Sequence, residues 1–398
     1  MTGRYGSHKT EKLEPETTCR RRFRPSAWLP LDSFFRLAFA PTRPKIISVK
    51  KVLLIPVLLL CLRFFSPPAE GAFSAFYIFG DSLSTTTNSL TLSSTNYAPG
   101  RFCNGPVWVE RLAQFQGIAF DTNQDIAQFG QGSATVSNLL VSYTFPASPS
   151  NALVAVWVAN SDLYFDFFFN STNASAWAQS ISNAVVATTA DIQQLYAKGC
   201  RSLILPNAVD ISAAPLISAN TNYDTAVRAF VRSQCITYNT AFDGVLSQAR
   251  AAYPALKIYA PDLFSLFDKL LANPAYYGLT NAGIDAQSDP ALLDKTINGP
   301  GTNYIFWDVI HPTAKVQAQL AAQVQQVVSP VGFSNLVMVG VSNRLNLVNL
   351  PIGATGSLES STNLVNWRTN FSFTAVGPAA SVLVSNTNAT RQFYRLQF

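Results

Sequence analysis

The chain has only two histidines, His8 and His311, among its 398 residues. A reaction that uses a neutral imidazole as its base must therefore use one of these two side chains. The five cysteines form no Cys-x-x-Cys pair and no cluster with histidine, which excludes the usual zinc-binding motifs. The sequence therefore predicts neither a metal site of this type nor a cofactor.

Charged residues are scarce, at 13% of the chain, and most of the positive charge lies at one end. Residues 1–51 hold twelve Lys/Arg and four Asp/Glu, whereas residues 72–398 hold fifteen Lys/Arg and seventeen Asp/Glu. The larger part is therefore close to neutral and lacks the basic stripe that nucleic-acid binding requires. We expect no nucleic-acid partner. Hydrophobic residues make up 48% of the chain, which is ample for a core.

The apolar run near the start of the chain is short. Lys50-Lys51 precedes the apolar residues 52–62, and small residues follow at positions 69 and 71. This is a secretory signal pattern, and the run is too short to span a membrane. We therefore expect secretion to an extracellular or periplasmic location, with no stable membrane span after processing. A non-cleaved anchor is the alternative.

The most informative motif follows an apolar run at residues 76–79. That run predicts a buried strand, and Gly80-Asp81-Ser82-Leu83 comes directly after it. Because ligands of open α/β sheets bind beyond the carboxyl ends of the strands, we expect Ser82 at a ligand-binding edge. A serine is a poor nucleophile at neutral pH and needs a nearby base, most often imidazole. Since His8 lies in the basic leader, His311 is the candidate base.

Asp308 precedes His311 by three residues. A carboxylate at this spacing can reach the imidazole Nδ1–H and fix the tautomer, which leaves the other ring nitrogen free to take the proton of Ser82. An incidental histidine in a surface loop is the alternative explanation. The two motifs together favour a Ser-His-Asp hydrolase.

With these motifs, residues from about Phe76 to Val328 resemble the GDSL (SGNH) family of lipases and esterases. The likeness is to the branch that holds secreted bacterial lipase/acyltransferases, thermolabile haemolysins and plant lipases. Residues 100–110 are similar to the family's Gly-Arg-Phe-Ser-Asn-Gly segment, with Cys103 where serine is usual. Residues 306–313 match the last family block closely, and residues 273–281 resemble the segment that often precedes it.

The resemblance implies that Ser82 is the nucleophile, His311 the base and Asp308 the group that orients it. The oxyanion hole of the family uses the N–H of the serine, the N–H of a glycine and an asparagine side chain. The resemblance assigns the glycine to Gly130, with Gly132 as the alternative. A glycine lets the backbone N–H approach a developing oxyanion without hindrance.

The asparagine block of the family, Gly-x-Asn-Asp, is altered in this chain. An ungapped alignment places Ala159 at the glycine position and Ser161 at the asparagine position, so that Asn160 lies one residue early. Three possibilities follow: Asn160 is re-aimed, Ser161 supplies a shorter donor, or the donor is lost. We favour Asn160 as the third oxyanion donor.

Buried apolar runs alternate with helical patterns through residues 72–330. Such alternation predicts an α/β fold with a doubly wound parallel sheet, and the family resemblance implies the flavodoxin-like form. The expected strands are residues 76–79, 152–158, 202–206 and 257–260, and the expected helices are residues 107–114, 174–197, 223–252 and 313–328.

From Pro330 onward, helical spacing gives way to short apolar runs separated by Gly, Pro and Asn turns. This predicts a small all-β sandwich at residues 331–398, which resembles accessory modules of secreted bacterial proteins. Surface attachment, glycan contact and a structural cap are its open roles. We thus expect a basic leader and signal peptide at residues 1–71, with translation starting near Val49, then a hydrolase domain at residues 72–330 and the sandwich.

These patterns predict a secreted serine ester hydrolase that forms an acyl-enzyme on Ser82. Its substrate would be a small-molecule, lipid or acylated-glycan ester. A carbohydrate acetyl esterase and a non-catalytic binding or attachment protein are the alternatives, and the absence of Gly-x-Ser-x-Gly disfavours an α/β-hydrolase. The aromatic residues 164–169, expected in a loop, either line an acyl pocket or belong to the core. The oligomeric state is not predicted.

Overall fold

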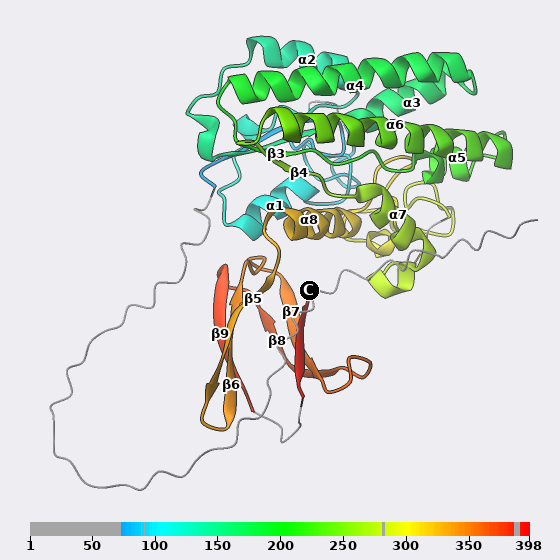
Figure 1. Ribbon diagram of the computed structural model, residues 1–398. Helices are drawn as coiled ribbons and strands as arrows, with labels where there is room; N and C mark the ends of the chain where they lie inside the picture. The colour runs from blue at the N-terminus through cyan, green and yellow to red at the C-terminus, as the bar shows by residue number, and fades with distance from the viewer. Residues whose placement is uncertain (1–72, 89, 91, 281–282, 386–390) are drawn as a thin grey trace, which may run out of the picture. The chain divides into compact units, whose positions relative to one another are not determined.

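The computed structural model describes residues 73–88, 90, 92–280, 283–385 and 391–398. The predicted leader, signal peptide and start site lie outside these residues. The described chain folds as an α/β part that ends near residue 330 and an all-β part that follows it (Figure 1). Within the described residues, no helix combines the length and apolar character needed to cross a membrane.

A parallel sheet forms the centre of the α/β part. Its strands, in their hydrogen-bonded order, are β1 (Phe76–Gly80), β2 (Leu153–Trp157), β3 (Ser202–Ile204) and β4 (Lys257–Tyr259). Phe76 pairs with Leu153 and Gly80 pairs with Trp157. Every residue of β1 and β2 is buried, as expected for parallel strands that helices cover on both faces.

A short extended segment at residues 125–128 continues the sheet beyond β1. The Ile126 N–H donates to the Ile78 carbonyl at 2.8 Å, and the Gln128 N–H donates to the Gly80 carbonyl at 3.1 Å. Counted in chain order, the sheet then runs 2-1-3-4-5, which is the flavodoxin-like order. The predicted fold class is confirmed.

Helices cover both faces of this sheet (Figure 1). On one side α1 (Trp108–Gln116) packs against α8 (Ala314–Val328), and on the other α4 (Ala174–Ala197) packs against α2 (Ser133–Ser142) and α6 (Thr225–Ala252). The remaining helices are α3 (Ala159–Asn170), α5 (Pro215–Ser218) and α7 (Leu263–Ala272), with 3₁₀ turns at Thr122–Gln124, Pro149–Asn151, Ile211–Ala213, Pro274–Tyr277 and Pro300–Asn303.

Helix α3 corrects the expectation that residues 164–169 form a loop, because these residues are helical. The sequence gives little helix signal here, since the segment is rich in aromatic residues and has no side-chain cap at its start. Tertiary packing compensates for this weak helix propensity. Phe167 is buried, and its ring makes an edge contact with the Tyr223 ring, with 4.9 Å between the ring centres. Packing of one face therefore determines this helix.

The described residues after 330 form two antiparallel sheets, as the predicted sandwich requires. One sheet has the order β5 (Gly332–Val339), β6 (Ser342–Val348) and β9 (Ala379–Ser385), and the other has the order β10 (Phe393–Gln397), β7 (Thr355–Ser361) and β8 (Arg368–Thr374). Leu345 and Val384 of the first sheet and Leu358 of the second belong to one buried core.

Candidate active site

Ser82 lies on the turn that follows β1, at the carboxyl edge of the sheet. The Asp81 N–H donates to the Trp157 carbonyl at 3.2 Å, and the Ser84 N–H donates back to the Asp81 carbonyl at 3.1 Å. The turn begins at Gly80, where an added Cβ would lie only 3.1 Å from the Trp157 carbonyl oxygen. A glycine therefore allows β1 to lie close to β2 just before the serine.

Two helices hold this turn in place. Gln317 of α8 donates from Nε2 to the Leu83 carbonyl at 3.3 Å and accepts the Trp108 N–H at 3.0 Å. Trp108 of α1 in turn donates from Nε1 to the Ser84 hydroxyl at 3.0 Å. All of these groups are buried, so the position of Ser82 is fixed by the packing of α1 and α8 beneath the turn.

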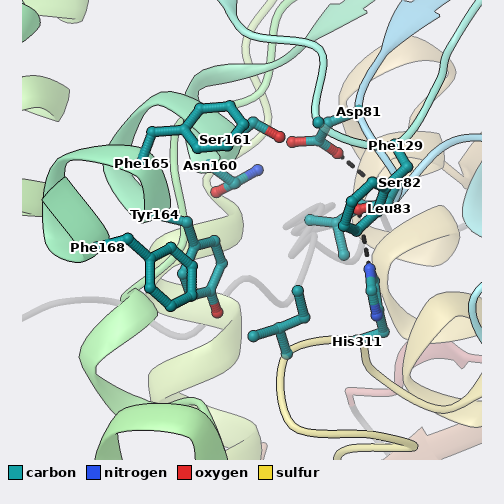
Figure 2. Close-up of a pocket in the computed structure, with 12 residues that line it drawn as sticks. Asp81, Ser82, Leu83, Phe129, Asn160, Ser161, Tyr164, Phe165, Phe168 and His311 are labelled. Carbon is teal, nitrogen blue, oxygen red and sulfur yellow. Dashed lines mark hydrogen bonds between the residues drawn. The ribbon is translucent and has the colours of Figure 1, made fainter.

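The structure brings His311 to Ser82, although 229 positions separate them in the chain. His311 Nε2 lies 2.9 Å from Ser82 Oγ, and Figure 2 shows the ring directed at the serine. The imidazole stacks on Phe102 with a ring-centre distance of 4.9 Å. His311 is 4% exposed, so one face of its ring is shielded from water by an aromatic side chain.

Asp308 lies on the opposite side of the His311 ring. Both carboxylate oxygens are 2.9 Å from His311 Nδ1, and Oδ1 also accepts the backbone N–H groups of Ile310 and His311 at 3.0 and 2.8 Å. The three-residue spacing works because this loop folds back on itself, with the Trp307 N–H donating to the His311 carbonyl at 2.7 Å.

Electrostatics keep Asp308 ionised in this position. Burial alone raises the pKa of the carboxyl, but the charge of His311 and the hydrogen bonds from His311 and Ile310 outweigh it and hold the pKa below its usual value. A carboxylate can only accept, so Nδ1 of His311 donates to it and Nε2 is left to accept the Ser82 hydroxyl proton. The arrangement can therefore remove a proton from Ser82.

Three N–H donors border a cavity beside Ser82. The Ser82 and Gly130 backbone N–H groups make no hydrogen bond within the part of the chain that the structure describes, and Asn160 Nδ2 is buried without a partner. All three residues line the same cavity. Gly130 has a φ of +73°, which favours glycine, whereas Gly132 caps α2 and does not line the cavity. Of the two glycines, the geometry favours Gly130.

Asn160 lies in the first turn of α3 and is 2% exposed. Its Oδ1 accepts the Val209 N–H at 3.0 Å, which fixes the amide plane and turns Nδ2 toward the cavity (Figure 2). Ser161 also lines the cavity, but its hydroxyl is directed at the Asp81 carboxyl. The geometry therefore favours Asn160 over Ser161 as the side-chain donor.

We expect Asn160→Asp to lower kcat for ester hydrolysis by about 10²- to 10³-fold with little change in KM. The variant keeps an acceptor for the Val209 N–H but replaces the donor by a negatively charged oxygen. Ser161→Ala is the matched control and should stay within a few-fold of the wild type. Steady-state kinetics on a soluble aryl ester measure both effects, and a larger loss in Ser161→Ala would show that Ser161 is the donor.

Asp81 carries the second carboxyl of the site. It is fully buried, its Oδ1 accepts the Leu83 N–H at 2.9 Å, and its Oδ2 has no partner among the described residues. Burial raises the pKa of Asp81 to about 7, with a smaller opposing effect from the Leu83 N–H and from His311. Asp81 therefore shapes the serine turn through the bond to Leu83 rather than through contact with the His311 ring.

The cavity itself is small, about 70 Å³, and its walls are mostly apolar. Tyr164, Phe165 and Phe168 of α3 line one side, and Phe129 and Ile310 line others. Phe129, Phe165 and Phe168 are also exposed at its rim, whereas Phe167 is buried in the core. Some of the aromatic residues at 164–169 therefore line the cavity, and Phe167 belongs to the core, so both roles considered from the sequence apply.

The segment at residues 100–110 positions the histidine loop rather than contacting the serine. Asn104 Oδ1 accepts the Ala314 N–H at 2.8 Å, at the start of α8 and directly after that loop. Cys103 donates from Sγ to the Gly105 carbonyl at 3.1 Å. Cys103, Cys200 and Cys235 are all buried free thiols. No group of three or more His, Cys, Asp or Glu side chains in the described ranges could hold a metal ion.

Two contacts of the site were not predicted. The Tyr97 hydroxyl donates to Asp308 Oδ2 at 3.1 Å, and Phe102 packs under the His311 ring. Phe102 lies in the segment that resembles the family, so a signal for it existed. Tyr97 lies in a stretch rich in Ser, Thr and Asn, and nothing in its local pattern distinguishes it.

Comparison with known proteins places this site in a family. Residues 76–324 match the family model described as GDSL-like Lipase/Acylhydrolase. A GDSL esterase/lipase of Arabidopsis thaliana is 23% identical over 63% of this chain and 88% of its own length, and another is 25% identical over 71% and 96%. The phosphatidylcholine-sterol acyltransferase of Aeromonas hydrophila is 24% identical over 64% of this chain and 89% of its own length.

Proposed function

The chain belongs to the family of GDSL-like lipases and acylhydrolases and is a carboxylic ester hydrolase, and we propose that it is secreted and works through an acyl-enzyme on Ser82. The observation that carries the mechanism is the 2.9 Å contact between Ser82 Oγ and His311 Nε2, with Asp308 bound to the other ring nitrogen. Secretion rests on the signal pattern at residues 50–71.

In the proposed reaction, Ser82 Oγ attacks the ester carbonyl carbon while His311 Nε2 takes the hydroxyl proton. The carbonyl oxygen becomes an oxyanion, which the N–H groups of Ser82 and Gly130 and the Asn160 amide stabilise. His311 then returns the proton to the leaving alkoxide, and the acyl group stays on Ser82. Water, deprotonated by His311, then attacks this ester. As the bond between the acyl carbon and Ser82 Oγ breaks, His311 returns the proton to Oγ, and the acid product leaves.

The experiment that tests this mechanism compares the wild type with Ser82→Ala on a soluble aryl ester. A non-catalytic binding protein on the same scaffold would give no hydrolysis in either protein. The retained contacts among Ser82, His311 and Asp308 argue against that alternative, since binding alone does not require them. Equal, non-zero rates in the two proteins would refute Ser82 as the nucleophile.

The apolar cavity is the candidate site for the acyl group. The space beside Ser82 is small, about 70 Å³, and aromatic side chains line it, so a short acyl chain fits it more readily than a long one. Phe168 closes one side of this space and is 55% exposed, so a longer chain would have to displace it or leave along the rim. We therefore propose that the enzyme prefers short acyl chains.

We expect Phe168→Ala to shift this preference toward longer acyl chains. Each further CH₂ buried in the enlarged space contributes about 0.8 kcal/mol, or roughly fourfold in kcat/KM. A series of aryl esters from acetate to laurate measures the shift. Phe169→Ala is the control, because Phe169 is the next residue of α3, is 80% exposed and does not line the cavity. A laurate preference in the wild type, unchanged in Phe168→Ala, would contradict this assignment.

A carbohydrate acetyl esterase is the second candidate, and the small volume of the cavity favours it. The relative described as a phosphatidylcholine-sterol acyltransferase, and the aromatic rim, favour a lipid ester instead. Release of acetate from acetylated xylan by the purified enzyme, at a rate above that for short aryl esters, would select the carbohydrate esterase.

A further inference from the structure

Tyr97 lies on a loop that the chemistry proposed above does not use. The loop follows the serine turn and is held at several points: the Tyr97 N–H donates to the Ser93 carbonyl at 2.8 Å, and the Ala98 N–H donates to the Cys103 carbonyl at 2.9 Å. The Tyr97 ring makes an edge contact with the ring of Trp307, the residue before Asp308, with 6.5 Å between the ring centres. These contacts fix the Tyr97 hydroxyl, which donates to Asp308 Oδ2 at 3.1 Å.

The two oxygens of Asp308 are held in different ways. Oδ1 accepts two backbone N–H groups from its own loop, whereas Oδ2 accepts only from His311 Nδ1 and from Tyr97 within the described residues. The terminal torsion of an aspartate is broad, so the backbone bonds at Oδ1 do not by themselves fix the plane of the carboxylate, and the His311 ring is the group that this plane must orient. Tyr97 supplies the second fixed point, and it comes from a segment about two hundred residues earlier in the chain.

We propose that Tyr97 is a positioning residue, which fixes the Asp308 carboxylate against His311 and moderates its negative charge. The inference rests on the proposed function of Ser82, His311 and Asp308. It also assigns a role to the loop around Tyr97, which supports the aspartate from outside the histidine loop. Burial and the charge of Asp308 raise the pKa of Tyr97 above its usual value, so its hydroxyl remains a donor at every pH at which the enzyme would work.

Tyr97→Phe removes the hydroxyl and keeps the ring that packs on Trp307. We expect kcat to fall about tenfold, as for the loss of a hydrogen bond to a charged group, with KM within twofold of the wild type. The acid limb of kcat/KM against pH should also move to higher pH by a few tenths of a unit. The shift is toward higher pH because an Asp308 carboxylate without the Tyr97 hydrogen bond carries more of its negative charge toward His311. It therefore stabilises the protonated ring more strongly, and the ring loses its proton at a higher pH.

The pH profile of Tyr97→Phe distinguishes a positioning role of Tyr97 from a merely structural one, because only a change at Asp308 moves the acid limb. Among the described residues, Asp81 interacts with His311, and Asp285, Cys103 and Tyr164 interact with Asp308; all four remain in the variant. Asn96→Ala is the control, since Asn96 anchors the same loop through a 2.9 Å bond to Gln287 and does not touch Asp308. It should leave the acid limb unmoved and kcat within a few-fold.

An unmoved acid limb in Tyr97→Phe, or an equal change in Asn96→Ala, would overturn the inference. Ser82→Ala is measured in the same series. If Ser82→Ala is inactive while Tyr97→Phe matches the wild type, only the role of Tyr97 is wrong. If Ser82→Ala retains full activity, the proposed function fails first.

Discussion

Ser82→Ala is expected to lower kcat/KM for ester hydrolysis by about 10⁴- to 10⁶-fold, the usual range for loss of a serine nucleophile. The variant keeps the N–H donors of the cavity and the His311–Asp308 pair, so any remaining rate reports oxyanion stabilisation without covalent catalysis. Removing one oxygen from a buried turn leaves the backbone bonds of Asp81 and Ser84 in place. The thermal midpoint of unfolding should therefore change little, and kinetics with a soluble aryl ester measure the loss.

Ser84→Ala is the matched control for this experiment. Ser84 lies on the same turn and is fully buried, but its hydroxyl accepts the Trp108 Nε1–H and does not reach His311. We expect Ser84→Ala to be less stable and to keep kcat within a few-fold. An organophosphonate should label the wild type at Ser82, as peptide mass spectrometry would show, and should fail to label Ser82→Ala. A label on another residue would refute the acyl-enzyme on Ser82.

Patterns of neighbouring residues in the sequence were sufficient to predict the regular helices and strands. Helix α4 spans Ala174–Ala197, the range that the helical pattern predicted, and the following Gly199 has the positive φ typical of a residue that ends a helix. The run at residues 76–79 became β1 because a continuous apolar segment is buried between two layers of helices. These predictions succeeded because each depends on residues close together in the chain.

The altered asparagine block shows where such reasoning ends. From the sequence, Asn160 and Ser161 both remained candidates, because an alignment gives positions but not the directions of side chains. The direction of the Asn160 amide depends on the Val209 N–H, 49 residues away, which holds Oδ1 and leaves Nδ2 facing the cavity. The contact of Tyr97 with Asp308 spans 211 positions and is equally invisible to a local pattern. Long-range partners of this kind require the folded chain.

Asp308→Asn should lower kcat by about 10⁴-fold, because it changes the tautomer of His311 rather than removing a reacting atom. An asparagine can keep Oδ1 as the acceptor for the Ile310 and His311 N–H groups, which places its NH₂ where Oδ2 now lies. That NH₂ would donate to His311 Nδ1 and favour the tautomer with the proton on Nε2. Such a ring cannot accept the proton of Ser82, and the imidazolium would also lose its counter-charge. Kinetics across a pH series measure the loss.

The control for Asp308→Asn must be another buried acid of the same neighbourhood. Asp285 is 1% exposed, its charge acts on Asp308, and its Oδ1 accepts the Ser288 N–H at 2.8 Å, a bond that asparagine can also accept. Asp285→Asn removes a negative charge without changing the partner of His311, so kcat should stay within a few-fold. A loss in Asp285→Asn as large as that in Asp308→Asn would mean that the field of the buried acids, rather than the orientation of the imidazole, controls the rate. Retention of more than about a tenth of the wild-type rate by Asp308→Asn would remove the orienting role altogether.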